Sequence, residues 1–291
     1  MGRDHSSLLD QGQIITIGIV GGGTMGSSIA SQVLMSGLSA VVIETKTDAV
    51  ERARARVLGT LKRARERGFI SLASEVADAR LMVTTDYASL RASSLVIESV
   101  PEIVELKRDV LTQVRDVVGE SIPIGSNTSS IAIGSLQEGL KSAERVGGLH
   151  FFNPVPASSL IEIVVGPMTS EATIEGFRQL AELLGKASIV VKDAPGFATS
   201  RLGVALGLEA IRMLEEGIAS AEDIDQAMAL GYKHPIGPLR LTDLVGLDVR
   251  LAIARYLEQQ LGARFSPPEL LVSMVEAGNL GKKSGRGFFV W

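Results

Sequence analysis

The chain has 291 residues, contains no cysteine and carries a formal net charge of −4. The absence of cysteine excludes disulfides, thiolate metal sites and cysteine nucleophiles. The acidic balance gives no electrostatic surface for nucleic acid or for an anionic membrane. A hydrophobic content of 45% indicates a folded globular protein, long enough for one large α/β unit or for two domains.

Neither a secretory leader nor a membrane-spanning segment is expected. Residues 1–12 are predicted to be a loose polar arm, and no run of 18 apolar residues follows them. The three histidines, His5, His150 and His234, show no metal-ligand spacing, so we expect no metal site. These features favour a cytoplasmic protein whose partners are small molecules or other protein surfaces.

A strand, a glycine turn and a helix are predicted in direct succession near the start of the chain. Residues 14–20 are apolar and β-branched, as in buried parallel strands. The following G-x-G-x-x-G pattern allows a tight turn, the approach of a pyrophosphate to the backbone, and close packing of the next helix. The cofactor-binding residues predicted in this turn are Gly21, Gly23, Thr24, Met25 and Gly26. The N-terminus of the helix would face the phosphates of a dinucleotide.

A second strand over residues 39–43 ends at Glu44. In dinucleotide-binding units an acidic residue roughly 20 positions after the glycines accepts hydrogen bonds from the adenosine ribose. Glu44 has this position relative to Gly23, and its charge would repel the 2′-phosphate of NADP. We therefore predict NAD as the cofactor, although Lys46 could weaken the preference.

Residues 48–67 are predicted as a long helix with basic faces. Such a run of charges usually indicates a helix surface in contact with solvent. Beside a nucleotide site, it could also bind a phosphate of a second ligand.

Strands and helices alternate up to about residue 190, which predicts a doubly wound parallel sheet. Further strands are expected over residues 81–84, 94–98, 122–126, 145–149, 160–165 and 187–191, and helices over 103–118 and 170–184. The remainder reads as helical, over residues 199–216, 220–231 and 248–261 and from about 269. We predict a Rossmann-type NAD-binding domain over residues 13–192 and a smaller all-helical C-terminal domain over residues 193–291. In the latter, Gly203 and Gly207 allow close approach of another helix, within the chain or in a dimer.

His150 lies at the end of a predicted parallel strand, where α/β sheets place their ligands. Glu162 interrupts the otherwise apolar strand over residues 160–165, and a buried carboxylate needs a partner. A neighbouring imidazole would be such a partner, and the pair would form a general acid/base dyad. The positions of His150 and Glu162 in the sequence leave one alternative open, in which His150 has a structural role and Glu162 lies on an edge strand.

Several motifs occur in order along the chain: ESVPE at 98–102, SNTSS at 126–130, HFFNPVP at 150–156, LIEIV at 160–164, DAPGF at 193–197 and GKKSGRGF at 281–288. Together they resemble the NAD-dependent L-3-hydroxyacyl-CoA dehydrogenase family, which includes the 3-hydroxybutyryl-CoA dehydrogenases. The resemblance extends from about residue 14 to the C-terminus. It implies an NAD domain, a helical domain that forms a homodimer, an active site between the two, and an acyl-CoA substrate.

The resemblance also implies roles for individual residues. His150 would take the proton of the substrate's 3-hydroxyl group, Glu162 would orient His150, and Ser129 would hydrogen-bond the substrate oxygen. The positions that line the NAD site are Glu102, Lys107 and Asn127, and those that contact CoA are Thr60, Arg63 and Arg67.

The chain departs from the family pattern at Ser200, where the family has an active-site asparagine. Serine can still hydrogen-bond, but it is shorter and lacks the amide group. Ser200 either caps the helix that begins here or indicates a substrate that differs near the thioester. Three hypotheses follow: an acyl-CoA dehydrogenase of this type, the same chemistry on a substrate bound to an acyl carrier protein, and a non-catalytic NAD-binding relative. Retention of His150, Glu162 and Ser129 argues against the third.

Overall fold

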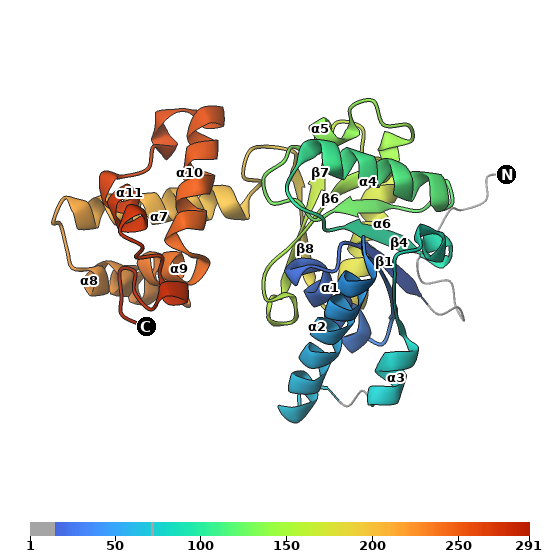
Figure 1. Cartoon of the computed structure of the whole chain (residues 1–291). Helices are drawn as coiled ribbons and strands as arrows, with labels where there is room; N and C mark the ends of the chain where they lie inside the picture. Colours follow the sequence, from blue (N-terminus) through green and yellow to red (C-terminus); the bar gives the residue numbers. More distant parts are fainter. Residues whose placement is uncertain (1–14, 71–72) are drawn as a thin grey trace. The chain divides into compact units, whose positions relative to one another are not determined.

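The computed structural model describes residues 15–70 and 73–291, which form two compact units (Figure 1). The first unit ends at Asp193 and the second begins at Ala194. The polar arm predicted over residues 1–12, including His5, lies outside the described residues. Within the described part of the chain, no helix is both long enough and apolar enough to span a membrane.

The first unit is built on an eight-stranded sheet with the order β3-β2-β1-β4-β5-β6-β7-β8. The strands are β1 (Thr16–Val20), β2 (Ser39–Ile43), β3 (Leu81–Thr84), β4 (Leu95–Glu98), β5 (Ile124–Ser126), β6 (Val146–Phe151), β7 (Leu160–Val165) and β8 (Ala187–Lys192). From β3 to β6 all neighbouring strands are parallel. Their carboxyl ends therefore meet at one edge of the sheet, where ligands bind in folds of this kind.

Helices cover the sheet, as their apolar spacing predicts. They are α1 (Thr24–Met35), α2 (Thr47–Glu66), α3 (Ser74–Ala79), α4 (Val104–Val117), α5 (Ile133–Gln137) and α6 (Glu171–Leu183). Ile29 and Val33 of α1, together with Val57 and Leu61 of α2, belong to the same buried cluster as Ile17 of β1. Both pairs are separated by four residues and so lie on one face of their helix. This packing fixes α1 and α2 beside the carboxyl end of β1.

The predicted fold class is confirmed, with one correction. β7 runs antiparallel to β6, and β8 is parallel to β7, so the sheet is not parallel throughout. The connection over residues 152–159 contains a single short 3₁₀ turn. A parallel crossover needs a dozen or more residues, so this connection can only return the chain in the opposite direction.

The second unit is helical. It contains α7 (Thr199–Glu215), α8 (Ala221–Gln226), the π-turn η4 (Ala227–Gly231), α9 (Pro238–Val245), α10 (Leu247–Leu261) and α11 (Glu269–Glu276). The sequence-based prediction missed α9 because Pro235, Gly237 and Pro238 indicate a loop. Pro238 is the first helical residue, where its missing N–H costs nothing. Buried Asp225 accepts hydrogen bonds from the N–H groups of Leu239 and Arg240 and so stabilises this helix start.

Candidate active site

The glycine turn after β1 packs tightly against the protein on its inner side, whereas its outer side is open. Gly21 has φ +96°, which favours glycine, and its N–H donates to the carbonyl of Ile43 at 2.9 Å. A Cβ at Gly26 would lie 1.8 Å from the carbonyl oxygen of Gly21, so only glycine allows α1 to pack here. A Cβ at Gly23 would meet nothing within 4 Å. The turn thus leaves room for a ligand above Gly23.

The start of α1 supplies hydrogen-bond donors to that space. Gly23 is the N-cap residue, and no side chain caps the helix. The first N–H groups of the helix are then available to an anion such as a pyrophosphate. Thr24 lines the adjoining pocket, whereas Met25 packs against the hydrophobic core. Of these two residues predicted at the cofactor site, only Thr24 faces the pocket.

Glu44, at the end of β2, lies against the same turn. Its Oε1 accepts a hydrogen bond from the N–H of Gly22 at 2.8 Å, and its Oε2 accepts one from the N–H of Thr45 at 3.2 Å. The carboxylate is therefore held beside the glycines, where the ribose of an adenine dinucleotide binds. The cradle fits NAD, and the negative charge opposes a 2′-phosphate.

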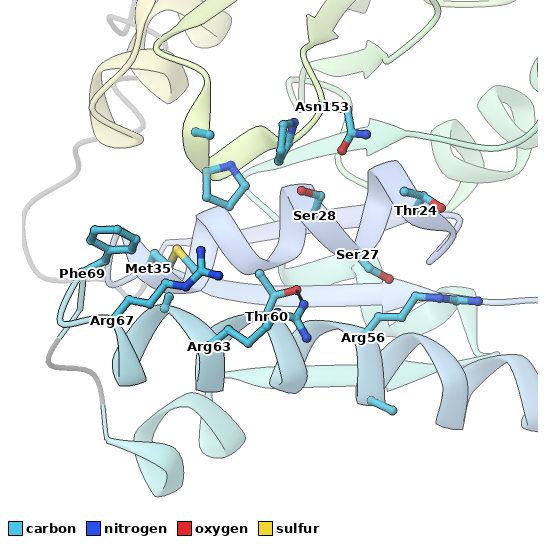
Figure 2. A pocket seen from close by; sticks show the side chains of 15 residues that line it. Thr24, Ser27, Ser28, Met35, Arg56, Thr60, Arg63, Arg67, Phe69 and Asn153 are labelled. Atoms are coloured by element: carbon cyan, nitrogen blue, oxygen red, sulfur yellow. Dashed lines mark hydrogen bonds between the residues drawn. The ribbon is translucent and has the colours of Figure 1, made fainter. Parts of the chain in front are cut away.

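A pocket of about 940 Å³ continues from this turn and is lined by α1, α2 and the loop after β6 (Figure 2). Thr60 and Arg63 of α2 line it together with Arg67, the residue that follows the last residue of α2, and these are the three positions matched to CoA contacts. Arg63 donates to the Oγ1 of Thr60 at 3.1 Å. None of the lining residues is acidic. The positive charge of this pocket suits the phosphates of a nucleotide-bearing substrate.

Arg56 is a further cation of this pocket that the sequence analysis did not single out. It lies one turn before Thr60 on the same side of α2 and donates to the carbonyl of Gly22 at 3.1 Å. Its guanidinium therefore links the arginine-lined pocket with the glycine turn. The four-residue spacing from Arg56 to Thr60 was the signal that could have identified it.

The opposite wall of the pocket comes from the loop after β6, which includes Asn153 and Pro154. A buried ammonium holds this loop. Lys186 donates to the carbonyl of Val155 at 2.7 Å and also to the carbonyl of Ser158. Burial lowers the pKa of Lys186. The loop is thereby fixed beside the end of β6, which carries His150.

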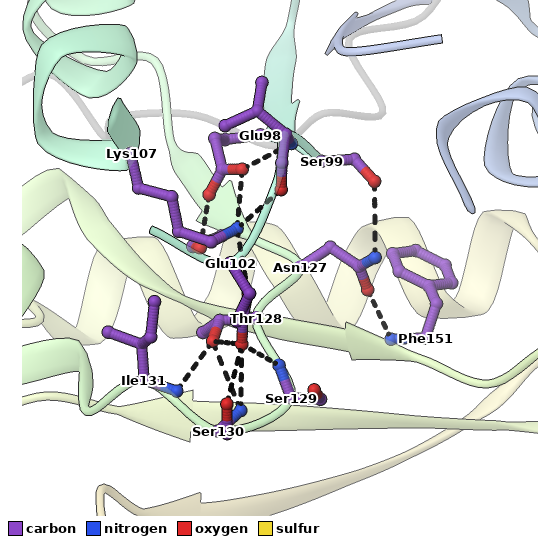
Figure 3. A network of polar contacts seen from close by, with 12 residues as sticks. Glu98, Ser99, Glu102, Lys107, Asn127, Thr128, Ser129, Ser130, Ile131 and Phe151 are labelled. Atoms are coloured by element: carbon purple, nitrogen blue, oxygen red, sulfur yellow. Dashed lines mark hydrogen bonds and ion pairs between the residues drawn. The ribbon is translucent and has the colours of Figure 1, made fainter. Parts of the chain in front are cut away.

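A buried ionic network lies at the ends of β4 and β5 (Figure 3). Lys107 of α4 is fully enclosed, and its ammonium lies 2.8 Å from Glu98 and 3.2 Å from Glu102. Such a cation needs close counter-charges, because removal from water is costly. Lys107, matched to a position that lines the NAD site, therefore lies within the wall, and Glu102 is the partly exposed member. Glu98 was not singled out from the sequence, although a carboxylate at the end of an apolar strand was a usable signal.

Glu102 shapes the loop that carries Ser129. Its Oε1 accepts hydrogen bonds from the Oγ1 of Thr128 at 2.5 Å and from the N–H groups of Ser129 and Ser130 at 3.0 and 3.1 Å. Burial raises the pKa of Glu102, but the hydrogen bonds from Thr128 and Ser129 and the charge of Lys107 outweigh it, and the pKa is lowered overall. The ionised carboxylate thus holds the loop, and Ser129 remains exposed at its surface.

Asn127 connects the ends of three strands. Its Oδ1 accepts a hydrogen bond from the N–H of Phe151 at 2.9 Å, and its Nδ2 donates to the Oγ of Ser99 at 3.4 Å. Figure 3 shows both contacts. Asn127 therefore fixes the end of β6 next to His150 and lies on the same sheet edge as the glycine turn.

His150 and Glu162 form a close pair. The antiparallel register sets them directly opposite each other, and His150 Nδ1 lies 2.8 Å from Glu162 Oε2. Glu162 has no exposed surface and His150 has 7%. β7 has neighbours on both sides, so Glu162 does not lie on an edge strand. A carboxylate on Nδ1 favours the tautomer in which Nε2 accepts a proton.

Ser200 lies in the second unit, in the first turn of α7. The helix begins at Thr199 with Ala198 as its N-cap residue, and no side chain caps it. The interpretation of Ser200 as a capping residue is therefore wrong. Among the described residues, no group of three or more histidine, aspartate or glutamate side chains is arranged to hold a metal ion.

One sheet edge thus brings together a dinucleotide cradle, a loop with an exposed hydroxyl and a buried carboxylate–histidine pair. A histidine held in one tautomer can exchange a proton with a substrate hydroxyl. A dinucleotide beside it can exchange a hydride. This combination suits the interconversion of an alcohol and a ketone.

Both units match known families. Residues 16–194 match the sequence model of the 3-hydroxyacyl-CoA dehydrogenase NAD binding domain, and residues 196–291 match that of the 3-hydroxyacyl-CoA dehydrogenase C-terminal domain. The two matches together cover nearly all of the described chain.

Individual relatives agree with these matches. The chain is 41% identical over 279 residues to a 3-hydroxybutyryl-CoA dehydrogenase of Mycobacterium tuberculosis, which covers 94% of this chain and 98% of that protein. It is 38% identical over 273 residues to a probable 3-hydroxybutyryl-CoA dehydrogenase of Deinococcus radiodurans, with coverage of 94% and 98%. The crystal structure of (S)-3-hydroxybutyryl-CoA dehydrogenase from Ralstonia eutropha aligns with a TM-score of 0.88 at 41% identity, over 96% of this chain and 99% of that one.

Proposed function

This chain belongs to the 3-hydroxyacyl-CoA dehydrogenase family, and on that basis we propose that it oxidises the 3-hydroxyl group of a short-chain (S)-3-hydroxyacyl-CoA reversibly to the 3-ketoacyl-CoA. It is an oxidoreductase that uses NAD. The contact of 2.8 Å between His150 and buried Glu162, beside the dinucleotide cradle, is the observation that carries the assignment of residues.

His150 acts as the general base. Nε2 takes the proton of the substrate's 3-hydroxyl group, and the Glu162 carboxylate stabilises the resulting imidazolium through Nδ1. Ser129, exposed on the loop held by Glu102, donates a hydrogen bond to the substrate oxygen. NAD, when bound, would supply the acceptor for the hydride that leaves C3. In the reverse direction, the same imidazolium returns its proton to the ketone oxygen.

The turn after β1 and its neighbours along the sheet edge would hold the cofactor. Gly21 and Gly26 shape the turn, Gly23 leaves space in which a pyrophosphate would fit, and Glu44 would accept hydrogen bonds from the ribose hydroxyls. Asn127, fixed to the end of β6, would contribute to the nicotinamide end of the site. The open space at Gly23 supports this placement.

The arginine-lined pocket binds the nucleotide part of CoA through Arg63 and Arg67. An acyl carrier protein is the alternative carrier, because it also presents a phosphate but no adenosine. The double variant Arg63→Met with Arg67→Met should raise KM for acetoacetyl-CoA and leave KM for acetoacetyl-pantetheine nearly unchanged. Arg52→Met is the matched control, since Arg52 lies on α2 but pairs with Asp48 outside the pocket. Equal rises for both thioesters, or higher kcat/KM with the acyl carrier protein, would contradict CoA as the carrier.

The function itself is tested by the oxidation of NADH with acetoacetyl-CoA, followed optically. Wild-type protein should turn over, and His150→Gln should lose turnover while it still binds NADH. Undiminished activity in His150→Gln would contradict the role of His150 as the general base. An inactive wild-type protein would overturn the proposed reaction.

Homodimer formation and a cytoplasmic location are further parts of the proposal. Leu244 and Val245 of α9 and Val249 of α10 are 41–44% exposed, although they are large apolar residues. A second copy of the helical unit that covers these residues would remove them from water. The family resemblance supports a dimer of this kind.

A further inference from the structure

Arg56 of α2 belongs to two features of the first unit, the arginine-lined pocket and the glycine turn after β1 (Figure 2). It lines the pocket together with Thr60 and Arg63, which follow it on the same side of the helix. Its Nη1 donates to the carbonyl of Gly22 at 3.1 Å. A guanidinium has five N–H donors, and none of the described residues that line the pocket is acidic. Donors of Arg56 therefore remain for an anion in the pocket.

Three side chains hold the backbone at Gly22. Glu44 Oε1 accepts a hydrogen bond from the N–H of Gly22 at 2.8 Å. The carbonyl of Gly22 accepts one from the Oγ of buried Ser27 at 2.7 Å, in addition to the one from Arg56. Gly22 also packs against α2, because a Cβ at this position would lie 2.6 Å from the Cβ of Ala53. The turn is thus in direct contact with α2, and its backbone orientation depends on side chains from both helices.

The carbonyl that Arg56 contacts belongs to the peptide group before Gly23, the N-cap residue of α1. This peptide group is trans, and in a planar trans peptide the N–H points opposite to the C=O. The Gly22 carbonyl points toward its two donors, so the N–H of Gly23 points away from them. A side chain that fixes this peptide group therefore fixes a donor at the helix start, where the phosphates of a dinucleotide would bind.

Arg56 is an exposed side chain, and holding it in one conformation costs conformational entropy. An anion in the pocket that binds its remaining N–H donors would restrict the guanidinium and favour its contact with Gly22. A dinucleotide that binds next would meet a turn that is already ordered, so less entropy would be lost in its binding. The two ligands should therefore strengthen each other's binding.

We propose that Arg56 is a positioning residue that couples the two ligand sites of the first unit. A phosphate-bearing thioester in the arginine-lined pocket strengthens the binding of NAD at the glycine turn. The inference rests on the proposed function, which assigns these ligands to the pocket and to the turn. Such coupling is reciprocal, because each ligand changes the dissociation constant of the other by the same factor.

The test measures the Kd of NADH by fluorescence titration without CoA and with saturating CoA, which carries the nucleotide part of the substrate but no acyl group. CoA should lower the Kd of NADH for wild-type protein by about fivefold or more. Arg56→Met should reduce this factor to less than about twofold. Without CoA, its Kd for NADH should stay within about twofold of the wild-type value, because Glu44 and Ser27 still hold Gly22. A residue that only supported the turn would change this second value instead.

Two variants are matched controls. Arg52→Met removes a cation of the same helix that pairs with Asp48 outside the pocket, so it should leave the coupling factor unchanged. Arg63→Met removes a cation of the pocket that donates to Thr60 rather than to the turn. It should weaken CoA binding and leave the factor at saturating CoA unchanged. A wild-type factor in Arg56→Met would overturn the inference, as would weaker binding of NADH to wild-type protein in the presence of CoA.

Turnover and binding report separately on the proposed function and on this inference. A protein that reduces acetoacetyl-CoA, although CoA does not change its Kd for NADH, would retain the proposed reaction and overturn the coupling. An inactive protein in which CoA strengthens NADH binding through Arg56 would overturn the reaction and support the coupling. Failure of CoA to bind wild-type protein would overturn the coupling. A melting curve establishes that each variant is folded, and Arg56→Gln serves if the methionine variant is not.

Discussion

His150 and Glu162 have different roles in the proposed pair, because His150 exchanges the proton and Glu162 stabilises the charged imidazole. Substitution of either residue should lower kcat and leave the affinity for NADH nearly unchanged. His150→Ala removes the base and should lower kcat by about 10²–10⁴-fold. Glu162→Gln should lower kcat as well, because the neutral amide no longer stabilises the imidazolium. NADH affinity, measured by fluorescence titration, should stay within about twofold in both, since the glycine turn is untouched. More than a tenth of wild-type kcat in His150→Ala would contradict the assignment.

The lowered pKa of Glu102 makes its contribution to stability dependent on pH. The folded chain binds its proton less readily than the unfolded chain, so the contribution is complete above the unfolded value of about 4.3. It is lost as the pH falls through the lower folded value. The free energy of unfolding of wild-type protein should therefore exceed that of Glu102→Gln at pH 6, and the difference should shrink below about pH 4.

Urea denaturation at a series of pH values measures this difference. Glu105→Gln is the control for the loss of one charge, because Glu105 is an exposed residue of α4, three positions along the chain. A difference between wild-type protein and Glu102→Gln that stayed constant from pH 6 to pH 3 would contradict the role of the ionised carboxylate.

At the residue scale, sequence reasoning anticipated the contact of His150 with Glu162 and missed residues that support the neighbouring loops. The pairing of His150 with Glu162 could be anticipated because a carboxylate in an apolar strand needs a partner. Glu98 was missed although it ends an apolar strand, and its partner Lys107 comes from another element. Thr128 could not be assigned, because its role depends on Glu102 reaching it from another element.

At the scale of elements, Gly23 and Gly26 of one turn should respond differently to the same substitution. Gly26→Ala would bring a Cβ to 1.8 Å from the carbonyl oxygen of Gly21, so it should destabilise the packing of α1 and lower the melting temperature. Gly23→Ala meets no protein atom within 4 Å and should leave the melting temperature nearly unchanged. Its methyl group enters the space for the pyrophosphate, so the Kd for NAD should rise at least about tenfold, or 1.4 kcal/mol.

Thermal melting and NADH titration of both variants separate these effects. Unchanged NAD affinity in a folded Gly23→Ala protein would contradict the placement of the pyrophosphate above the turn. Gly59→Ala, within α2, controls for the general effect of replacing a helical glycine.

Hydrophobic periodicity predicts the order of strands and helices, but it predicts neither the direction of β7 nor the presence of α9. β7 has the apolar composition of its parallel neighbours, and only the short connection before it determines that it runs antiparallel. α9 follows residues that normally indicate a loop, and its start depends on Asp225, which lies 14 residues before Leu239 in the preceding helix. The start of α9 therefore arises from a tertiary contact that the local pattern does not contain, whereas the direction of β7 follows from the length of one connection.

At the scale of the whole molecule, the exposed apolar residues of α9 and α10 predict self-association. Sedimentation at micromolar concentration should give a dimer for wild-type protein. Leu244→Glu, which introduces a charge at a residue 44% exposed in the single chain, should shift the equilibrium toward monomer. Phe69→Glu, at an exposed apolar residue after α2 in the first unit, is the control and should remain dimeric. A wild-type protein that sediments as a monomer would contradict the proposed dimer.

In the proposed reaction, a hydride leaves C3 of the hydroxyacyl group for NAD while His150 takes the hydroxyl proton. The most direct measurement uses (S)-3-hydroxybutyryl-CoA with deuterium at C3 and analyses the reduced cofactor by mass spectrometry. Wild-type protein should give one deuterium per molecule of reduced cofactor, and His150→Ala should give almost no reduced cofactor. Reduced cofactor without deuterium, or no reduction by the wild-type protein, would contradict the proposed reaction.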